Sequence, residues 1–282
     1  MCYSETGSHP PMRWRTLLAL GFLAFAALGV LWAQKPFREW PALEYERFPI
    51  PADANRPAEW TRARLRFPDI TGYPRNSVYG AFPGYWTMDY PRSDRHLLTG
   101  VRRLTRIDTR SVEQVVELDG TDEIYNWPVS YGVEVGHWLL PVEQAKQLRD
   151  YLLRGGFLMV DDFHGTQEWK IFEDGLERVF PDRQWVDLPA GDPVFHVLYD
   201  ITERTQIPGA QYLETGRTYE RDGYEAHWRG VYDDKGRIMV AICHNMDMGD
   251  AWEHSDNPEY PEKWASLAYR IGMNYLVYDL TH

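Results

Sequence analysis

The chain has 282 residues and a formal net charge of -12. Such an acidic protein lacks the basic surface that nucleic acids and anionic lipids require, so neither is expected as a main partner. Hydrophobic residues make up 44% of the sequence, and there are 12 tryptophans and 18 tyrosines. These values indicate a folded domain with an aromatic-rich core, although an aromatic surface that binds sugars or partners is the alternative.

The first feature along the chain is an apolar run at residues 16–33, which two arginines precede. This order of charged and apolar residues is typical of a secretory signal peptide or a signal anchor. As a helix the run would be about 27 Å long, enough to cross the core of a bilayer. We therefore expect the rest of the chain to be exported, either anchored in the membrane by this single helix or released to the periplasm by cleavage after Ala33. Both Met1 and Met12 are consistent with the start of the protein.

Residues 34–58 are rich in proline, which opposes regular structure, and we interpret them as a linker. Residues 59–282 then form a single α/β domain. Its Cys243 is expected in the core, because free cysteine is among the most buried residue types. The other cysteine, Cys2, would lie on the opposite side of the membrane, so no disulfide is expected.

Hydrophobic periodicity predicts strands and helices that alternate through this domain. A strand at 61–67 precedes a loop rich in glycine, proline and aromatic residues, and a helix at 93–104 begins at Ser93. The further predicted elements are strands at 112–118, 129–135, 157–160, 184–188 and 194–199, helices at 141–154, 168–180 and 261–278, and a hairpin of 227–232 with 237–243. This order predicts a three-layer α/β sandwich of the flavodoxin-like kind, with a mainly parallel sheet, helices on both faces and an antiparallel hairpin.

Polar side chains follow three of these predicted strands. Because ligands bind at the carboxyl ends of strands in open α/β sheets, we expect parallel neighbours to bring such side chains to one rim. The residues concerned are His137, then Asp161, Asp162 and His164, then His244, Asn245, Asp247 and Asp250, with Asp89, Arg92 and Asp94 added by the segment 89–94 that follows the first strand.

The residue types at this rim suit acid–base catalysis or the binding of a small ligand. We predict catalytic roles for Asp161, Asp162, His164 and His244. The remaining residues are predicted to bind the ligand: Asp89, Arg92, Asp94, His137, Asn245, Asp247 and Asp250. Carboxylates and histidines also bind divalent metals, but no spacing matches a metal motif, so no metal ligand and no cofactor is assigned. The alternative is structural, because an aspartate after a buried strand commonly caps the next helix.

Three segments together resemble a known bacterial family. They read MDYPRSDRH at 88–96, RGGFLMVDDFHG at 154–165 and HNMDMGDAW at 244–252, and they resemble the family called domain of unknown function 4159. The resemblance covers residues 59–282 and implies an α/β domain similar in organisation to class I glutamine amidotransferases, in a family whose members are exported or membrane-attached. It implies no activity. The segment at 161–165, where those enzymes carry a nucleophilic cysteine, contains neither cysteine nor serine, so glutamine hydrolysis is not implied.

Two functions are consistent with these observations. The first is a non-catalytic envelope protein, held at the membrane by its N-terminal helix, that binds a protein partner, a glycan or a small ligand. The second is a hydrolase-like enzyme that acts on an envelope substrate such as a glycan, with the acid–base residues of the rim. The second requires Asp162, His164 and His244 to converge.

Overall fold

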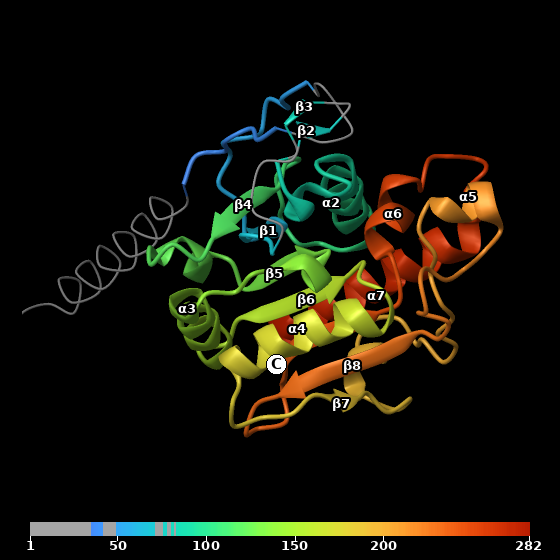
Figure 1. Cartoon of the computed structure of the whole chain (residues 1–282). Coiled ribbons are helices and arrows are strands. Elements are labelled where there is room, and N and C mark those ends of the chain that lie inside the picture. The colour runs from blue at the N-terminus through green and yellow to red at the C-terminus, as the bar shows by residue number, and fades with distance from the viewer. Residues whose placement is uncertain (1–34, 42–48, 71–75, 78–79, 82) are drawn as a thin grey trace, which may run out of the picture. The chain divides into compact units, whose positions relative to one another are not determined.

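A seven-stranded sheet runs through the domain, with the strand order β4-β1-β5-β6-β9-β8-β7 (Figure 1). This computed structural model describes residues 35–41, 49–70, 76–77, 80–81 and 83–282. The sheet consists of β1 (Ala63–Arg66), β4 (Gln114–Glu117), β5 (Val129–Val133), β6 (Phe157–Asp161), β7 (Val186–Asp187), β8 (His227–Tyr232) and β9 (Ile238–His244). A separate short pair is formed by β2 (Asn76–Ser77) and β3 (Gly80–Ala81). Five neighbouring strands are parallel, in the spatial order β4, β1, β5, β6 and β9. Strand β8 pairs antiparallel with both β9 and β7.

Helices cover both faces of the sheet. They are α2 (Arg92–Leu104), α3 (Val142–Leu153), α4 (Gly165–Val179), α5 (Gln211–Thr215), α6 (Met248–Glu253) and α7 (Glu262–Thr281). Residues of α2, α6 and α7 belong to one hydrophobic cluster, and residues of α3 and α4 belong to a second cluster on the other face. Strand β6 supplies both clusters, with Met159 in the first and Leu158 in the second, because successive side chains of a strand point to opposite faces. The predicted three-layer sandwich with a mainly parallel sheet is confirmed.

The core is rich in aromatic side chains, as the composition indicates. Among the residues that the structure describes, four tryptophans are no more than 1% exposed: Trp86, Trp127, Trp138 and Trp252. Cys243 is fully buried, as predicted, and its sulfur lies 3.6 Å from the hydroxyl of Tyr275. The aromatic content therefore serves mainly to fill the two hydrophobic clusters.

Most predicted elements are present, and the differences have local causes. The strand predicted at 194–199 is wrong, because a 3₁₀ helix at Pro193–Phe195 occupies its start. The carboxylate of Asp192 accepts a hydrogen bond from the backbone N–H of Val194 and begins this turn. Helix α4 begins three residues before the predicted position, directly after His164. The short helices α5 and α6 were not predicted, because neither is long enough to show helical periodicity.

The apolar run at 16–33 lies outside the residues that the structure describes. Within the described part of the chain, no helix is both long and apolar enough to cross a membrane.

Candidate functional site

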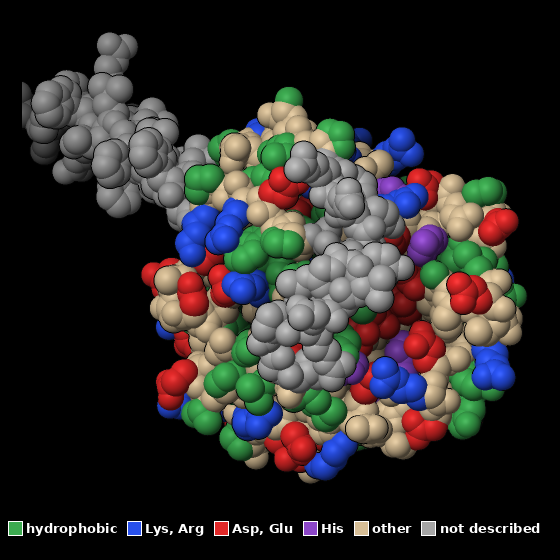
Figure 2. Space-filling model, turned by 45° about the horizontal axis from the view of Figure 1, so that its top comes forward, with side chains coloured by type: hydrophobic (Ala, Val, Ile, Leu, Met, Phe, Trp, Pro, Cys, Tyr) green, Lys and Arg blue, Asp and Glu red, His purple; other side chains and the backbone are tan. Residues whose placement is uncertain are grey.

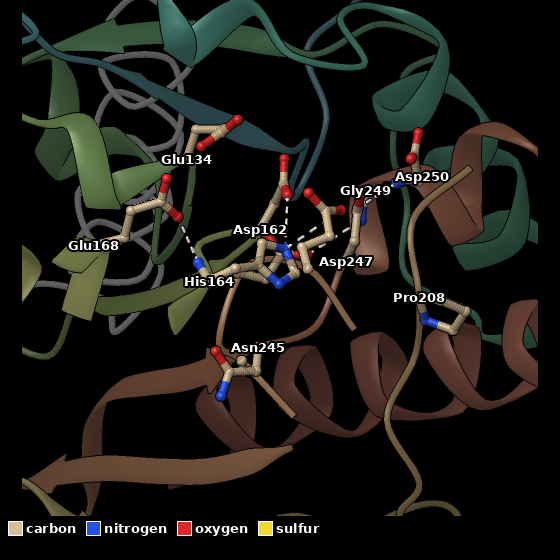
Figure 3. Close-up of polar contacts among 12 residues, drawn as sticks. Glu134, Asp162, His164, Glu168, Pro208, Asn245, Asp247, Gly249 and Asp250 are labelled. Atoms are coloured by element: carbon tan, nitrogen blue, oxygen red, sulfur yellow. Dashed lines mark hydrogen bonds and ion pairs between the residues drawn. The ribbon is translucent and has the colours of Figure 1, made fainter. Parts of the chain in front are cut away.

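Three neighbouring parallel strands, β5, β6 and β9, end at the same edge of the sheet. Val133 of β5 pairs with Asp161 of β6, and Val160 of β6 pairs with Ile242 of β9. The segments that follow these strands therefore lie side by side. We call them the carboxyl rim, and define it as residues 134–137, 161–168 and 244–250, together with Asp89, Glu220 and Arg221. Figure 3 shows Asp162 and Asp247 beside the ring of His164, with Glu134 and Glu168 further along the rim.

The backbone of the rim is conformationally strained. Among the described residues, five non-glycine residues have a positive φ, and all five belong to the rim: Asp89, Glu134, Asp162, Arg221 and Asn245. Glu134, Asp162 and Asn245 directly follow β5, β6 and β9. Left-handed conformations of non-glycine residues persist only where the surrounding structure enforces them, and they gather at ligand and active sites. The strain therefore makes this edge a candidate functional site.

Asp162 and His164 form a buried pair at the centre of the rim. They are 6% and 4% exposed, and Oδ1 of Asp162 lies 3.2 Å from Nε2 of His164. The pKa of Asp162 is raised well above its usual value, first by burial and then by the negative charges of Glu134 and Asp89. Burial and, to a smaller extent, the charge of Arg221 lower the pKa of His164 to about 3. Both shifts favour the uncharged form of the side chain, and Oδ1 of Asp162 and Nε2 of His164 lie close enough for a hydrogen bond.

Asp161 points to the other face of the strand and holds helix α6 in place. Its Oδ2 accepts hydrogen bonds from the backbone N–H groups of Met248, at 2.8 Å, and Gly249, at 3.1 Å. Burial raises the pKa of Asp161 to about 6, although a hydrogen bond with Tyr131 acts to lower it. Because its carboxylate is committed to the first turn of α6, Asp161 positions the rim.

Asp89, Asp247 and Asp250 form a second group of carboxylates. One carboxylate oxygen from each of them lies within 4.8 Å of the others. Oδ1 of Asp247 accepts a hydrogen bond from the backbone N–H of Asp250 at 2.7 Å and caps α6. Oδ2 of Asp250 accepts from the backbone N–H of Ala210 at 2.5 Å, and its Oδ1 lies 3.5 Å from Nε2 of His254.

The two aspartates of helix α6 have opposite pKa shifts. The pKa of Asp247 is raised well above its usual value by burial and by the charges of Asp162 and Asp250. Burial also acts to raise the pKa of Asp250, but hydrogen bonds from His254 and from the N–H of Ala210 outweigh it, so the net pKa is lowered. These opposite directions favour the protonated form of Asp247 and the ionised form of Asp250.

His137 belongs to a third group, with Glu134 and Glu168. Its Nδ1 lies 3.0 Å from Glu134 Oε2, and its Nε2 lies 3.4 Å from Glu168 Oε1. Glu168 also forms an ion pair with Arg221 and accepts a 2.5 Å hydrogen bond from the backbone N–H of His164. The ring of Tyr85 stacks on that of His137 at 3.8 Å. This group fixes the first turn of α4 against the turn that follows β5.

His244 and Asn245 bind backbone groups near the start of α4. Nε2 of His244 lies 3.2 Å from the carbonyl of Gly165, and its ring packs against Phe163 and Trp169. Oδ1 of Asn245 accepts from the N–H of Gly165 at 2.8 Å, and its Nδ2 donates to the carbonyl of Glu225. These contacts give both residues a structural role.

The buried His244 is expected to cause a measurable loss of stability in acid. Burial lowers the pKa of His244 to about 3, whereas an unfolded histidine titrates near pH 6.5. The unfolded state therefore binds more protons below pH 6.5, and the contribution of His244 to stability is lost as the pH falls toward 3. As the pH falls from 6.5 to 4.5, we expect the free energy of unfolding of His244→Phe to rise by about 2 kcal/mol relative to that of the wild type. The slope of this difference should reach up to about 1.4 kcal/mol per pH unit. Urea unfolding at several pH values measures this, and a difference that does not vary with pH would contradict it.

Two predicted ligand-binding residues have other partners. Asp94 is fully buried, and its carboxylate lies 2.9 Å from Nε of Arg62 and 2.8 Å from Nη2 of Arg64. Arg92 forms an ion pair at 2.6 Å with the exposed Asp256. Asp94 is therefore engaged in the core, and Arg92 is engaged at the surface.

The rim also contains residues that were not predicted as site residues. Oε1 of Glu220 lies 3.9 Å from Nε2 of His164, and Arg221 forms an ion pair with Glu168. Both lie in a loop without periodic structure, so no local pattern pointed to them. Glu134 directly follows β5, and Glu168 lies in the first turn of α4. Their positions, after a strand and at the start of a helix, could have indicated from the sequence that they belong to the rim.

The sequence matches the family described as Domain of unknown function (DUF4159) over residues 77–280. No curated protein matches the chain. The matched region contains α2 to α6, all of α7 except Thr281, every strand of the seven-stranded sheet except β1, and every rim residue described above. The chain therefore belongs to the DUF4159 family.

Proposed function

We propose that the carboxyl rim is a general acid–base site and that the protein is a hydrolase-like enzyme. The observation that carries this proposal is the Asp162–His164 pair. A buried carboxyl group, whose raised pKa favours its protonated form, lies on a strained turn between a central strand and a helix, in contact with an imidazole whose lowered pKa favours its neutral form. A carboxyl group that stays protonated at neutral pH is a general acid, and its pKa has been shifted toward the pH at which it would act.

Glu220 is the best-placed general base. Its Oε1 approaches the same nitrogen of His164 that Asp162 contacts. Its side chain is 32% exposed, which gives it access to water, and its pKa is raised, mainly by burial and then by the charge of Glu134. In this mechanism Glu220 removes a proton from water, the water oxygen bonds to the substrate carbon, and Asp162 protonates the leaving oxygen as its bond to carbon breaks. The proton on Glu220 then returns to Asp162 through solvent.

A hydroxyl-rich substrate such as a glycan fits the composition of the site. Figure 2 shows a hollow on one face of the protein in which acidic side chains gather, with histidines beside it. Carboxylates accept hydrogen bonds from sugar hydroxyls, and the neighbouring loop carries Tyr219 and Tyr224, whose rings are 4.8 Å apart. Tyr224 is 65% exposed and could stack on a sugar ring. Together with the apolar run at 16–33, this supports an exported domain that acts on an envelope glycan.

The position of Asp162 is comparable to a nucleophile elbow, which is a sharp turn from strand to helix. This similarity supports the amidotransferase-like organisation, as part of the proposal. It does not support glutamine hydrolysis, because residues 161–165 contain no cysteine or serine. The same missing nucleophile favours the second candidate function, a non-catalytic protein that binds a glycan or an envelope partner at the rim.

Two isosteric variants, Asp162→Asn and Glu220→Gln, test the enzymatic proposal. Each removes a proton-transferring group with little change in shape, so we expect hydrolysis of glycan and chromogenic glycoside substrates to fall at least about 100-fold. Asp182→Asn is the matched control, because Asp182 pairs with Arg149 at the surface, and it should leave the rate unchanged. Equal rates in all variants would contradict the mechanism. Glycan binding that Asp162→Asn weakens, without any turnover by the wild type, would instead favour the binding function.

A further inference from the structure

We propose that Asp89, Asp247 and Asp250 bind a hard divalent cation of the Mg²⁺, Mn²⁺ or Ca²⁺ class. The three residues come from the loop before α2 and from the start of α6, and their closest carboxylate oxygens lie within 4.8 Å of one another. Asp89 and Asp247 are 2% and 4% exposed. A cation that these oxygens surround would be held by buried ligands that the fold has already positioned. This proposal does not depend on the acid–base mechanism.

Two glycines allow the carboxylates to approach so closely. A Cβ atom at Gly249 would clash with Oδ2 of Asp89. A Cβ atom at Gly209 would lie 2.6 Å from Oδ2 of Asp247 and 2.8 Å from Oδ2 of Asp250. The backbone at both positions therefore forms part of the wall that holds the three side chains together. Any larger residue would push at least one carboxylate away from the others.

His164 is a second, independent indication of a ligand. Its side chain is only 5% exposed, and Figure 3 shows its ring between Asp162 and Asp247. Within the described part of the chain, Nδ1 of this ring is buried and has no hydrogen-bond partner. A buried polar atom without a partner costs free energy, and one in a native structure indicates a bound water, ion or ligand.

The charges around Asp247 favour a cation. The strongest electrostatic influences on it come from other carboxylates, namely Asp162, Asp250, Asp89 and Asp161. Burying several carboxylates together is costly unless protons or cations neutralise them. A divalent cation bound between the three carboxylates would neutralise them.

The ligand atoms indicate the class of cation. Three carboxylate groups offer only oxygen, which is the preferred donor of Mg²⁺, Mn²⁺ and Ca²⁺. The group of Glu134, His137 and Glu168 is a weaker candidate for a metal, because Arg221 already neutralises Glu168. The Asp89 group is therefore the better match to a hard cation.

Calorimetric titration of the chelator-treated full chain with Mn²⁺, Mg²⁺ and Ca²⁺ tests the proposal. We expect saturable binding of at least one of these ions at one site per chain. The variants Asp247→Asn and Asp89→Asn should weaken the Kd at least tenfold. Asparagine caps helices as well as aspartate does and tolerates positive φ, so both variants should fold. Asp279→Asn is the matched control, because Asp279 is a buried carboxyl group with 3% side-chain exposure that pairs with Arg237. It should keep the wild-type Kd.

Asp162→Asn separates this proposal from the acid–base mechanism. It removes the proposed general acid but none of the three cation ligands, so saturable binding of one cation per chain should persist. Three results would overturn the cation site: no saturable binding of any of the three ions, unchanged affinity in Asp247→Asn and Asp89→Asn, or binding that Glu168→Gln abolishes and Asp247→Asn does not.

Discussion

Asp94→Asn is expected to lower the free energy of unfolding by about 3–5 kcal/mol. Asp94 is fully buried and accepts contacts from two buried arginines, with Nε of Arg62 at 2.9 Å and both Nε and Nη2 of Arg64 within 2.9 Å. Asparagine retains the shape and some hydrogen bonds but not the charge. Two guanidinium groups would then remain buried without their counterion, which is the costly way to break such a pair. Chemical denaturation measures the change.

The surface pair of Arg92 and Asp256 provides the control for Asp94. Asp256 is 58% exposed, and its carboxylate lies 2.6 Å from Arg92. Exposed ion pairs contribute at most about 1 kcal/mol, so Asp256→Asn should change stability by less than that. If the Asp94 and Asp256 variants had equal effects, the buried arginines would have to be neutralised by something other than Asp94.

Trp252→Ala is the second change with a large expected effect. Trp252 is fully buried in α6, its ring lies 4.6 Å from the guanidinium of Arg62, and it packs edge-on against Tyr131 with a centroid distance of 6.0 Å. Removing a buried tryptophan side chain costs about 3–5 kcal/mol through lost contacts and the cavity that remains. Because α6 carries Asp250 and begins after Asp247, the variant should also weaken ligand binding at the rim.

Thermal and chemical unfolding of Trp252→Ala can be compared with those of Tyr224→Ala. Tyr224 is 65% exposed, so its replacement should cost less than about 1 kcal/mol. A Trp252 variant as stable as the Tyr224 variant would mean that α6 does not depend on this anchor.

The layers of the fold could be predicted from local patterns. The apolar run FLMV at 157–160 indicates a strand that is buried on both faces, and the structure places β6 in the middle of the seven-stranded sheet. The polar clusters after β5, β6 and β9 could be located because parallel strands end at one edge. Periodicity did not reveal α6, whose six residues complete fewer than two turns, although Asp247 supplies an ordinary helix cap.

The role of each side chain at the rim could not be predicted, because it depends on contacts between distant segments. Asp161 and Asp162 are adjacent in sequence, yet one holds the start of α6 and the other contacts His164. His244 looked equivalent to His164, but its ring packs against Phe163 and Trp169. Glu220 approaches His164 from a loop more than fifty residues further along the chain, and no sequence pattern encodes that approach.

The protonation state of Asp162 is the most direct test of the proposed acid–base site. Infrared difference spectra of the metal-free wild type and Asp162→Asn at pH 7 report it, because a protonated carboxyl group and an ionised carboxylate absorb at different frequencies. Burial and the neighbouring carboxylates raise the pKa of Asp162 well above its usual value, so the carbonyl band of a carboxylic acid should be present in the wild type and missing from the variant. A difference spectrum that contains only the bands of an ionised carboxylate would contradict the assignment of Asp162 as the general acid.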